Sequence, residues 1–375
     1  NSQISGRRFA YLATVTDSSS TSYTFGKNMD QNYGTTAIDE YAVDVTWEVA
    51  DKTDIGVDMR LLNNKLNLQF DYFKESREGI YLRRSSIPSY VGMINNPYGN
   101  IGKVENKGFE LSVNYANSWG GDWSLSLMGN YSFNRNKVLE DDSTVVYPWQ
   151  NTIGNKVGQR FGLVALGLFE NYGEIAASPV QTGDTRPGDI KYKDINGDGK
   201  IDEYDKVPIG WGSVPEIMYG FGFSVGWKNL SLTAMFQGAA HVDAMLSGEG
   251  VLPFSQGSSR GNLLSNITDR WTEENPRQNA FYPRLSIGNI NMNYEESTWW
   301  LKDTDYLRLK NIELSYRLPD HWMKRIHLDN ARIFIQGVNL LTFSSFKIWD
   351  EELGDGRGAR YPNIASVSLG VNFNF

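Results

Sequence analysis

The chain lacks cysteine, has few prolines and histidines, and contains no long apolar run. Of its 375 residues none is Cys, 12 are Pro and 3 are His. The absence of cysteine fits, without proving, an oxidising compartment of the cell envelope. No stretch approaches the roughly 18 consecutive apolar residues that a membrane-spanning helix needs. Helical membrane proteins are therefore excluded, whereas β-barrels are not, since their strands are only half apolar.

Basic residues are fewer than acidic ones: 36 Lys and Arg against 44 Asp and Glu. The formal net charge is -8 and the isoelectric point is about 5.1, which disfavours nucleic acid as the partner. The mean hydropathy is -0.44. A negative value does not argue against a membrane location, because every second residue of a barrel strand is polar.

A strict alternation of apolar and polar residues is the clearest positive signal. In residues 366–375, Val, Leu, Val, Phe and Phe alternate with Ser, Ser, Gly, Asn and Asn. A period of two predicts a strand with one apolar and one polar face. An exposed apolar edge invites aggregation in a soluble protein, whereas a barrel wall presents that face to lipid.

Three hairpins show the same alternation with consistent parity on both arms. Their turns lie at 62–65, 120–122 and 228–229. In the last hairpin, Trp227 and Leu230 flank a two-residue turn and so share the apolar face, as such a turn requires. The agreement between register and pattern predicts antiparallel pairing.

Ten strands follow from this pattern, and their connections alternate between short and long. The short connections are 62–65, 120–122, 228–229 and 319–327, and the long ones are about 18–52, 78–103, 138–215, 241–304 and 343–362. The first strand is placed at 5–17, and a change of parity between Leu309 and Ile312 predicts a bulge. Short periplasmic turns and long extracellular loops are typical of outer-membrane barrels.

The predicted fold is therefore an all-β transmembrane antiparallel barrel, with residues 1–375 in one barrel domain. Ten strands with loops of this size would crowd the mouth of a small closed barrel, and an isolated piece would leave open edges in lipid. We therefore expect further strands and any plug to precede Asn1 in a larger protein.

Several segments resemble SusC-like TonB-dependent outer-membrane transporters. Residues 100–111 (NIGKVENKGFEL) and 187–202 (PGDIKYKDINGDGKID) match motifs of that family, as do 306–312 (YLRLKNI) and 336–342 (QGVNLLT). Residues 46–58 and the terminal strand add to the match. The resemblance covers essentially the whole chain.

The resemblance implies a 22-stranded barrel with an N-terminal plug, of which this chain would supply about the last ten strands. It also implies the outer membrane of a Gram-negative bacterium, a SusD-like surface lipoprotein as partner, and energy coupling through TonB. The segments that contact TonB and form the plug have no counterpart in this sequence.

An acidic, glycine-containing segment predicts a Ca²⁺ site in the 138–215 loop. Its oxygen ligands occur at the spacing of a calcium loop, with a Gly at the sixth position. The predicted ligands are Asp194, Asn196, Asp198, Lys200 (through its carbonyl), Asp202 and Asp205. We expect the ion to brace the loop rather than to take part in catalysis. A polar turn without a metal is the alternative, because the twelfth residue is Asp instead of Glu and no helices flank the segment.

Aromatic residues of the long loops are candidates for binding substrate. Tryptophan rings stack on the C–H faces of sugars, and amides and carboxylates bind their hydroxyls. The candidates are Trp149, Trp211, Trp271, Trp299, Trp300 and Trp349. Packing inside the loops, or against a partner protein, is the alternative for each of them.

These observations favour a nutrient importer that performs no covalent chemistry. A glycan is the favoured substrate because of the loop tryptophans, and a peptide is the alternative. A barrel with an adhesive or structural role is a second hypothesis. An enzyme is disfavoured, because the three histidines are scattered and the sequence shows no convergent catalytic set.

Overall fold

The computed structural model describes residues 11–25, 31–41, 43–91, 93, 95–255, 263–325 and 328–374. Within these ranges, no helix is both long enough and apolar enough to cross a membrane. The chain divides into two compact units. One unit takes residues 1–53, 73–107 and 135–157, and the other takes 54–72, 108–134 and 158–375.

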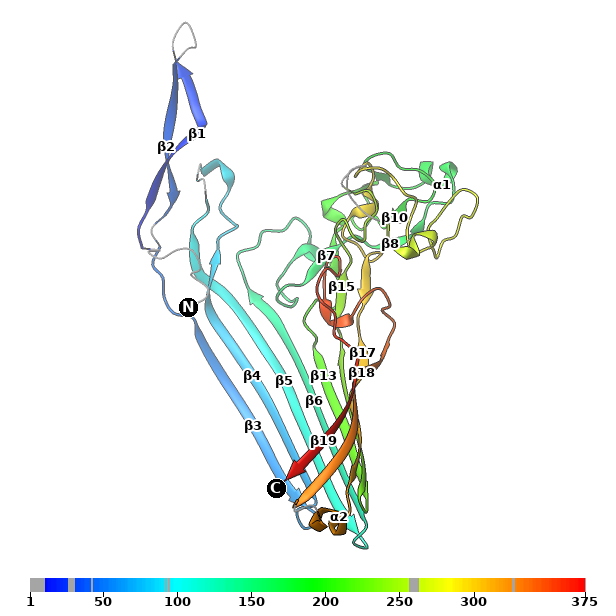
Figure 1. Cartoon of the computed structure of the whole chain (residues 1–375). Coiled ribbons are helices and arrows are strands. Elements are labelled where there is room, and N and C mark those ends of the chain that lie inside the picture. The colour runs from blue at the N-terminus through cyan, green and yellow to red at the C-terminus, as the bar shows by residue number, and fades with distance from the viewer. Residues whose placement is uncertain are drawn as a thin grey trace. The chain divides into compact units, whose positions relative to one another are not determined.

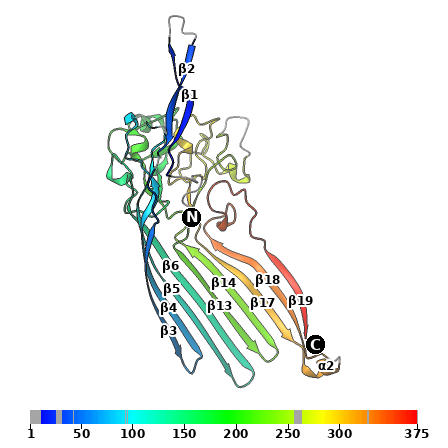
Figure 2. The ribbon, with the colours of Figure 1, turned by 90° about the vertical axis from the view of Figure 1, so that its left-hand side faces the viewer.

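Nine strands form one sheet in which sheet order follows chain order (Figures 1 and 2). They are β3 (Val49–Leu61), β4 (Leu66–Arg83), β5 (Tyr98–Trp119), β6 (Trp123–Glu140), β13 (Ile217–Trp227), β14 (Leu230–Ala240), β17 (Tyr306–Arg317), β18 (Asn330–Ser344) and β19 (Ser366–Asn374). From β6 to β19 each neighbouring pair is antiparallel. Nine of the ten predicted strands are therefore confirmed in this sheet.

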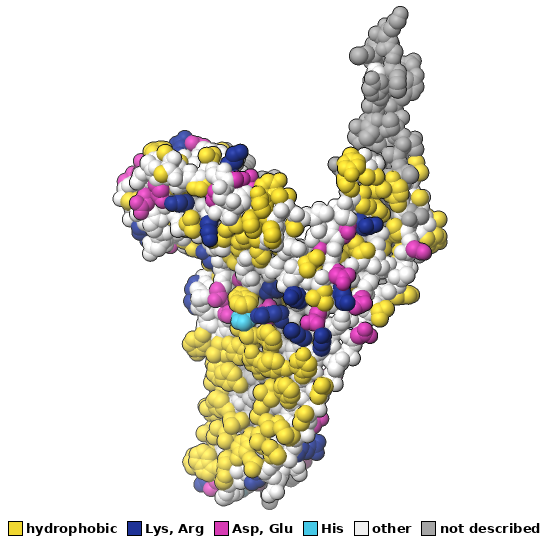
Figure 3. Space-filling model, turned by 180° about the vertical axis from the view of Figure 1, so that it is seen from behind, with side chains coloured by type: hydrophobic (Ala, Val, Ile, Leu, Met, Phe, Trp, Pro, Cys, Tyr) yellow, Lys and Arg dark blue, Asp and Glu magenta, His cyan; other side chains and the backbone are white. Residues whose placement is uncertain are grey.

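The alternation of the sequence places apolar side chains on one face of the sheet. In the register of β6, β13 and β14, Trp123 lies opposite Trp227, which lies opposite Leu230. On β19, Val367 is 65% exposed and Leu369 is 78% exposed. Figure 3 shows hydrophobic side chains gathered over the strand region. An apolar face this exposed suits contact with lipid.

Positive-φ residues make the predicted short turns. Leu62, Asn63 and Asn64 adopt φ values of 57°, 56° and 65° between β3 and β4. Gly120 (58°) and Gly121 (75°) connect β5 and β6, and Lys228 (53°) begins the turn after β13. The fourth short connection contains helix α2 (Asp320–Arg325). Positive φ at these positions matches the twist of the flanking strands, so the turns fix the register.

Two predicted boundaries need correction. The predicted 78–103 loop is partly strand, because β4 continues to Arg83 and β5 starts at Tyr98. Tyr81 stacks on Tyr98 with ring centroids 5.0 Å apart, and Lys103 pairs with Glu78. These cross-strand pairs stabilise the extension of both strands.

The first predicted strand, 5–17, lies partly outside the described residues. Its described end belongs to β1 (Thr14–Phe25), which pairs with β2 (Gln31–Glu40) in a separate two-stranded sheet. The predicted 18–52 connection thus contains a hairpin and the start of β3. The final residue of the predicted terminal strand, Phe375, is also outside the described residues.

The predicted bulge is confirmed on β17. Asn311 pairs with Met235 and Leu309 pairs with Phe236, so Lys310 is the extra residue. The same interruption appears toward β18, between Leu309 and Asn311. The bulge restores the apolar face on both sides of the break.

Three of the long loops, 138–215, 241–304 and 343–362, contribute to a packed body with its own hydrophobic core. Leu163, Ile190 and Tyr282 are completely buried, and Trp300 is 1% exposed. Four small two-stranded sheets contribute: β7 (Arg160–Gly162) with β12 (Val207–Ile209), β8 (Ala165–Leu168) with β10 (Ile190–Tyr192), β9 (Val180–Gln181) with β11 (Lys200–Ile201), and β15 (Asp243–Met245) with β16 (Leu301–Asp303). The short helix α1 (Tyr172–Ala176) is also in this segment.

Candidate functional site

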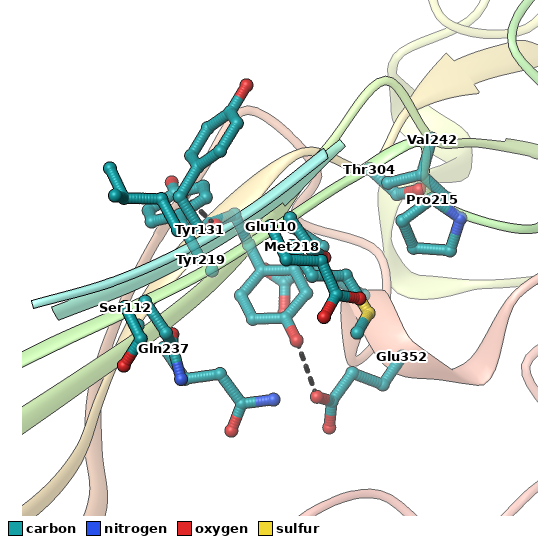
Figure 4. A pocket seen from close by; sticks show the side chains of 18 of the residues that line it. Glu110, Ser112, Tyr131, Pro215, Met218, Tyr219, Gln237, Val242, Thr304 and Glu352 are labelled. Atoms are coloured by element: carbon teal, nitrogen blue, oxygen red, sulfur yellow. Dashed lines mark hydrogen bonds between the residues drawn. The ribbon is translucent and has the colours of Figure 1, made fainter. Parts of the chain in front are cut away.

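A hollow of about 690 Å³ lies against the polar face of the sheet. Strands β4, β5, β6, β13, β14 and β17 and the turn at 351–354 contribute to it, all from the second unit. Its polar lining includes Gln69, Asp71, Glu110, Ser112, Asn130, Ser132, Gln237, Tyr306, Glu351 and Glu352. Figure 4 shows Gln237 and Glu352 directed toward the same space from different elements.

The register of the strands places lining residues from neighbouring strands opposite one another. Asn130 of β6 lies opposite Gly220 of β13, which lies opposite Gln237 of β14. A Cβ at Gly220 would approach the Asn130 Oδ1 atom to 2.8 Å. The glycine therefore leaves room for the Asn130 amide to lie across the neighbouring strand, and two amides share one stretch of wall.

The lining is acidic. It contains the carboxylates of Asp71, Glu110, Glu351 and Glu352, and no Lys or Arg among the described lining residues. Beside it, Asp305 accepts the Val242 N–H at 3.1 Å, and burial raises the pKa of the Asp305 carboxyl. Such a wall favours hydroxyls, amides and cations over anions.

A buried arginine fixes the acidic turn to the wall. Arg308 is 2% exposed, and its guanidinium contacts Asp350 at 3.1 Å, Glu351 at 3.0 Å and Glu352 at 3.0 Å. Tyr306 donates a further hydrogen bond to Glu352 at 2.6 Å, dashed in Figure 4. A carboxylate buried without such a partner would be costly, so one cation holds three acids beside the hollow.

The structure places the candidate tryptophans in different environments. Trp271 and Trp300 are 5% and 1% exposed and belong to the loop core. The Trp300 Nε1–H donates to the Asn293 carbonyl at 2.7 Å. Trp299 and Trp349 are partly buried and pack against the same core. All four rings pack in or against the loop core, and neither buried ring presents a face to a ligand. Contact of the partly buried pair with substrate stays a prediction.

Of the other two tryptophans, Trp211 is exposed and Trp149 is partly buried. Trp211 is 42% exposed, and its ring stacks on His241 with centroids 4.0 Å apart. Trp149 stacks on Tyr147 at 4.6 Å. Trp149 belongs to the first unit and Trp211 to the second. Their contact with substrate stays a prediction.

The predicted calcium loop uses its oxygens to bond its own backbone. Asp194 accepts N–H bonds from Gly197 (2.6 Å) and Gly199 (2.9 Å). Asp205 is completely buried and accepts from Ile195 at 2.7 Å and Asp202 at 2.9 Å. In the described parts of the chain, no group of three or more His, Cys, Asp or Glu is placed to hold a metal ion.

The remaining predicted ligands also belong to this turn. Asn196 accepts from the Asp198 N–H at 3.0 Å, and Asp198 accepts from the Lys200 N–H at 2.9 Å. Asp202 caps the following turn by accepting from Tyr204 at 2.8 Å. These bonds curl the segment, but the Ca²⁺ ion itself stays a prediction.

Sequence reasoning missed the residues of the hollow. Asp71 and Glu110 occupy polar positions of alternating strands, so a search for charges on the polar face could have found them. Arg308 and the 350–352 turn gave no such signal, because some forty residues separate them in the chain.

Comparison with known proteins identifies the family. Residues 14–340 match the model of the TonB dependent receptor-like β-barrel. TonB-dependent receptor P3 of Formosa agariphila is 28% identical over 92% of this chain and 36% of its own length. TonB-dependent receptor SusC of Bacteroides thetaiotaomicron is 24% identical over 99% of this chain and 36% of its own.

The fold has a matching solved structure. The RagAB peptide importer in its open-open state superposes with a TM-score of 0.68 at 20% identity, over 98% of this chain and 38% of the matched chain. The chain thus spans a little over a third of the relatives it matches. The resemblance to SusC-like receptors is confirmed at the level of the family, and the chain belongs to the TonB-dependent receptor β-barrels of the outer membrane.

Proposed function

We propose that the protein containing this chain imports nutrient oligomers across the outer membrane in a TonB-dependent manner. The observation that carries the proposal is the 690 Å³ hollow on the polar face of a sheet whose other face is apolar and exposed. Membership of the receptor family supports it. The chain supplies binding and passage, and no covalent step.

A glycan is the favoured substrate. The hollow offers three amides, several hydroxyls and four carboxylates, and these groups can donate hydrogen bonds to sugar hydroxyls or accept them. The exposed Trp211 ring adds a face on which a sugar could stack. Four of the six candidate tryptophans pack in or against the loop core, so Trp211 and the polar lining carry the preference for a glycan.

A peptide is the alternative substrate, favoured by the structural similarity to a peptide importer. Backbone amides of a peptide would find the same donors and acceptors in the hollow. The proposed partners are a SusD-like surface lipoprotein and the TonB complex, both expected from the similarity to SusC. An adhesive or structural barrel is the remaining hypothesis.

Uptake by cells carrying the full-length gene tests the proposal. We expect deletion of the gene to abolish growth on one class of oligomer, and Glu110→Gln together with Gln237→Ala to reduce uptake several-fold at unchanged surface abundance. Ser224→Ala, on the same face but outside the hollow, serves as the control.

The growth substrate separates the alternatives. Growth loss on glycans alone supports the favoured substrate, and growth loss on peptides alone supports the second. If deletion changed neither kind of growth but reduced cell attachment, import would be wrong and the adhesive barrel would replace it.

A further inference from the structure

A second hollow, of about 600 Å³, lies within the loop body. Segments 264–266, 302–303 and 345–348 and the ring of Phe281 line it, all within the second unit. One part of the lining is apolar, with Phe281 and the 4% exposed Phe346. The rest is polar, with Ser265, Asn266 and two lysines. It shares no lining residue with the hollow on the sheet.

Lys302 is the unusual member of this lining. Its Nζ donates to the Trp299 carbonyl at 2.8 Å and lies 5.2 Å from the centroid of the Phe281 ring. Among the described residues, no carboxylate pairs with this ammonium. Burial lowers the pKa of this ammonium. A lysine ammonium has three N–H donors, so capacity remains for an acceptor in the hollow.

The other charges leave the hollow positive. Asp303 is the only carboxylate among its described lining residues, and its Oδ1 already accepts the Asp305 N–H at 2.8 Å. Lys347 is exposed and adds a second ammonium. The lining of this hollow carries two ammonium groups and one carboxylate, so its net charge is positive, whereas the net charge of the lining on the sheet is negative.

We propose that this hollow is a subsite for a carboxylate carried by the imported oligomer. Lys302 and Lys347 bind the carboxylate, Ser265 and Asn266 bind neighbouring hydroxyl or amide groups, and Phe281 packs against the ring or chain. Because the lining on the sheet is acidic, the oligomer carries one terminal carboxylate rather than one on every unit. The proposal rests on the import function and names the substrate's charge.

Binding to the purified full-length protein in detergent tests this subsite. The probes are a trisaccharide with one terminal glucuronate and the same trisaccharide with that carboxyl reduced to an alcohol, compared by calorimetry. A second pair is a short peptide with a free or an amidated C-terminus. We expect the charged member of one pair to bind about tenfold more tightly, with a preference that weakens as salt rises.

Variants separate ligand binding from a structural role. Lys302→Met should abolish the preference for the charged probe, and Lys302→Arg should keep most of it. Lys193→Met, an exposed lysine outside the hollow, should change nothing. Thermal unfolding of Lys302→Met should be only slightly below that of the parent, because the ammonium it removes donates one hydrogen bond, to the Trp299 carbonyl, and forms no ion pair with a described residue.

Two results would overturn the subsite. One is equal affinity for the charged and neutral members of both pairs. The other is an unchanged preference in Lys302→Met accompanied by lower stability, which would make the lysine a structural hydrogen-bond donor. Uptake in cells tests import independently of this binding experiment. Normal uptake with no charge preference would reject the subsite alone. A charge preference without uptake would reject import alone.

Discussion

At the residue scale, the most consequential group is the buried Arg308. Its single positive charge pairs with three carboxylates of one turn, and two of these line the hollow on the sheet. Removal of one member of a buried ionic network leaves the others unpaired, which costs more than the network itself contributes. The arginine therefore determines whether the turn stays at the wall.

Arg308→Met should release this turn and lower stability by about 3–5 kcal/mol. Arg332→Met on the neighbouring strand is the matched control, since its pair with Glu313 is 40% and 23% exposed. We expect the control to cost about 1 kcal/mol or less. Denaturant titration on gels that separate folded from unfolded barrel measures both. Similar costs would show that burial does not set the value of the Arg308 network.

A second residue-scale prediction concerns Gly188, whose φ is +85°. A Cβ there would approach the Trp271 ring to 2.2 Å, whereas a Cβ at Gly197 (φ +74°) meets nothing within 4 Å. Gly197→Ala should cost about 1–2 kcal/mol, for backbone strain alone. Gly188→Ala should cost a further ~1–3 kcal/mol from overpacking.

Limited proteolysis of the loops compares these two glycine variants. Faster cleavage is expected in Gly188→Ala than in Gly197→Ala. Equal cleavage would mean that the Trp271 ring moves aside without cost, and that the close approach does not constrain the loop core.

At the element scale, the 194–205 turn is held by bonds from its own side chains to its backbone. Buried Asp205 ties the two ends together, whereas exposed Asp198 accepts from the Lys200 N–H and the Asn196 side-chain amide. The two aspartates therefore contribute differently to folding. Only substitution of Asp198 can test metal binding without dismantling the turn.

If the turn binds Ca²⁺, a chelator should speed proteolysis at 194–205 in the parent, and added Ca²⁺ but not Mg²⁺ should reverse this. Asp198→Ala should abolish the response, because it removes one carboxylate ligand while the bonds of Asp205 persist. Calorimetry without heat of Ca²⁺ binding at millimolar concentration would leave the metal-free turn as the correct description.

At the scale of the whole molecule, the two faces of the sheet meet different solvents. One face carries exposed aliphatic and aromatic side chains, and the other carries amides, hydroxyls and charges. In a membrane this division fixes which way each strand faces. A charge should therefore be tolerated on one face and not on the other.

Adjacent residues of β18 test that division. Ile335 is 47% exposed on the apolar face, and Gln336 lies opposite Glu313 on the polar face. Ile335→Lys should reduce the folded fraction recovered from outer membranes, at a cost of about 2–4 kcal/mol near the bilayer centre. Gln336→Lys should leave it nearly unchanged. Equal recovery would place both faces in water.

The alternation along each strand and the short turns were predictable because they are local properties. The positions of Trp227 and Leu230 on either side of a two-residue turn predict which face each strand presents and how the two strands align. The structure confirms this pairing, with a positive φ at Lys228 in the turn. The bulge at Lys310 was readable for the same reason. The sequence by itself thus determined an all-β wall with one apolar face.

Only the tertiary structure decided the loops and the hollows. Trp300 looks like a surface ring in the sequence, yet distant segments bury it to 1% exposure. Arg308 pairs with the 350–352 turn, and Lys302 lines one hollow together with the segment at 345–348, although these segments are distant along the chain. Such contacts depend on how long loops fold back, and alternation within a strand carries no information about that.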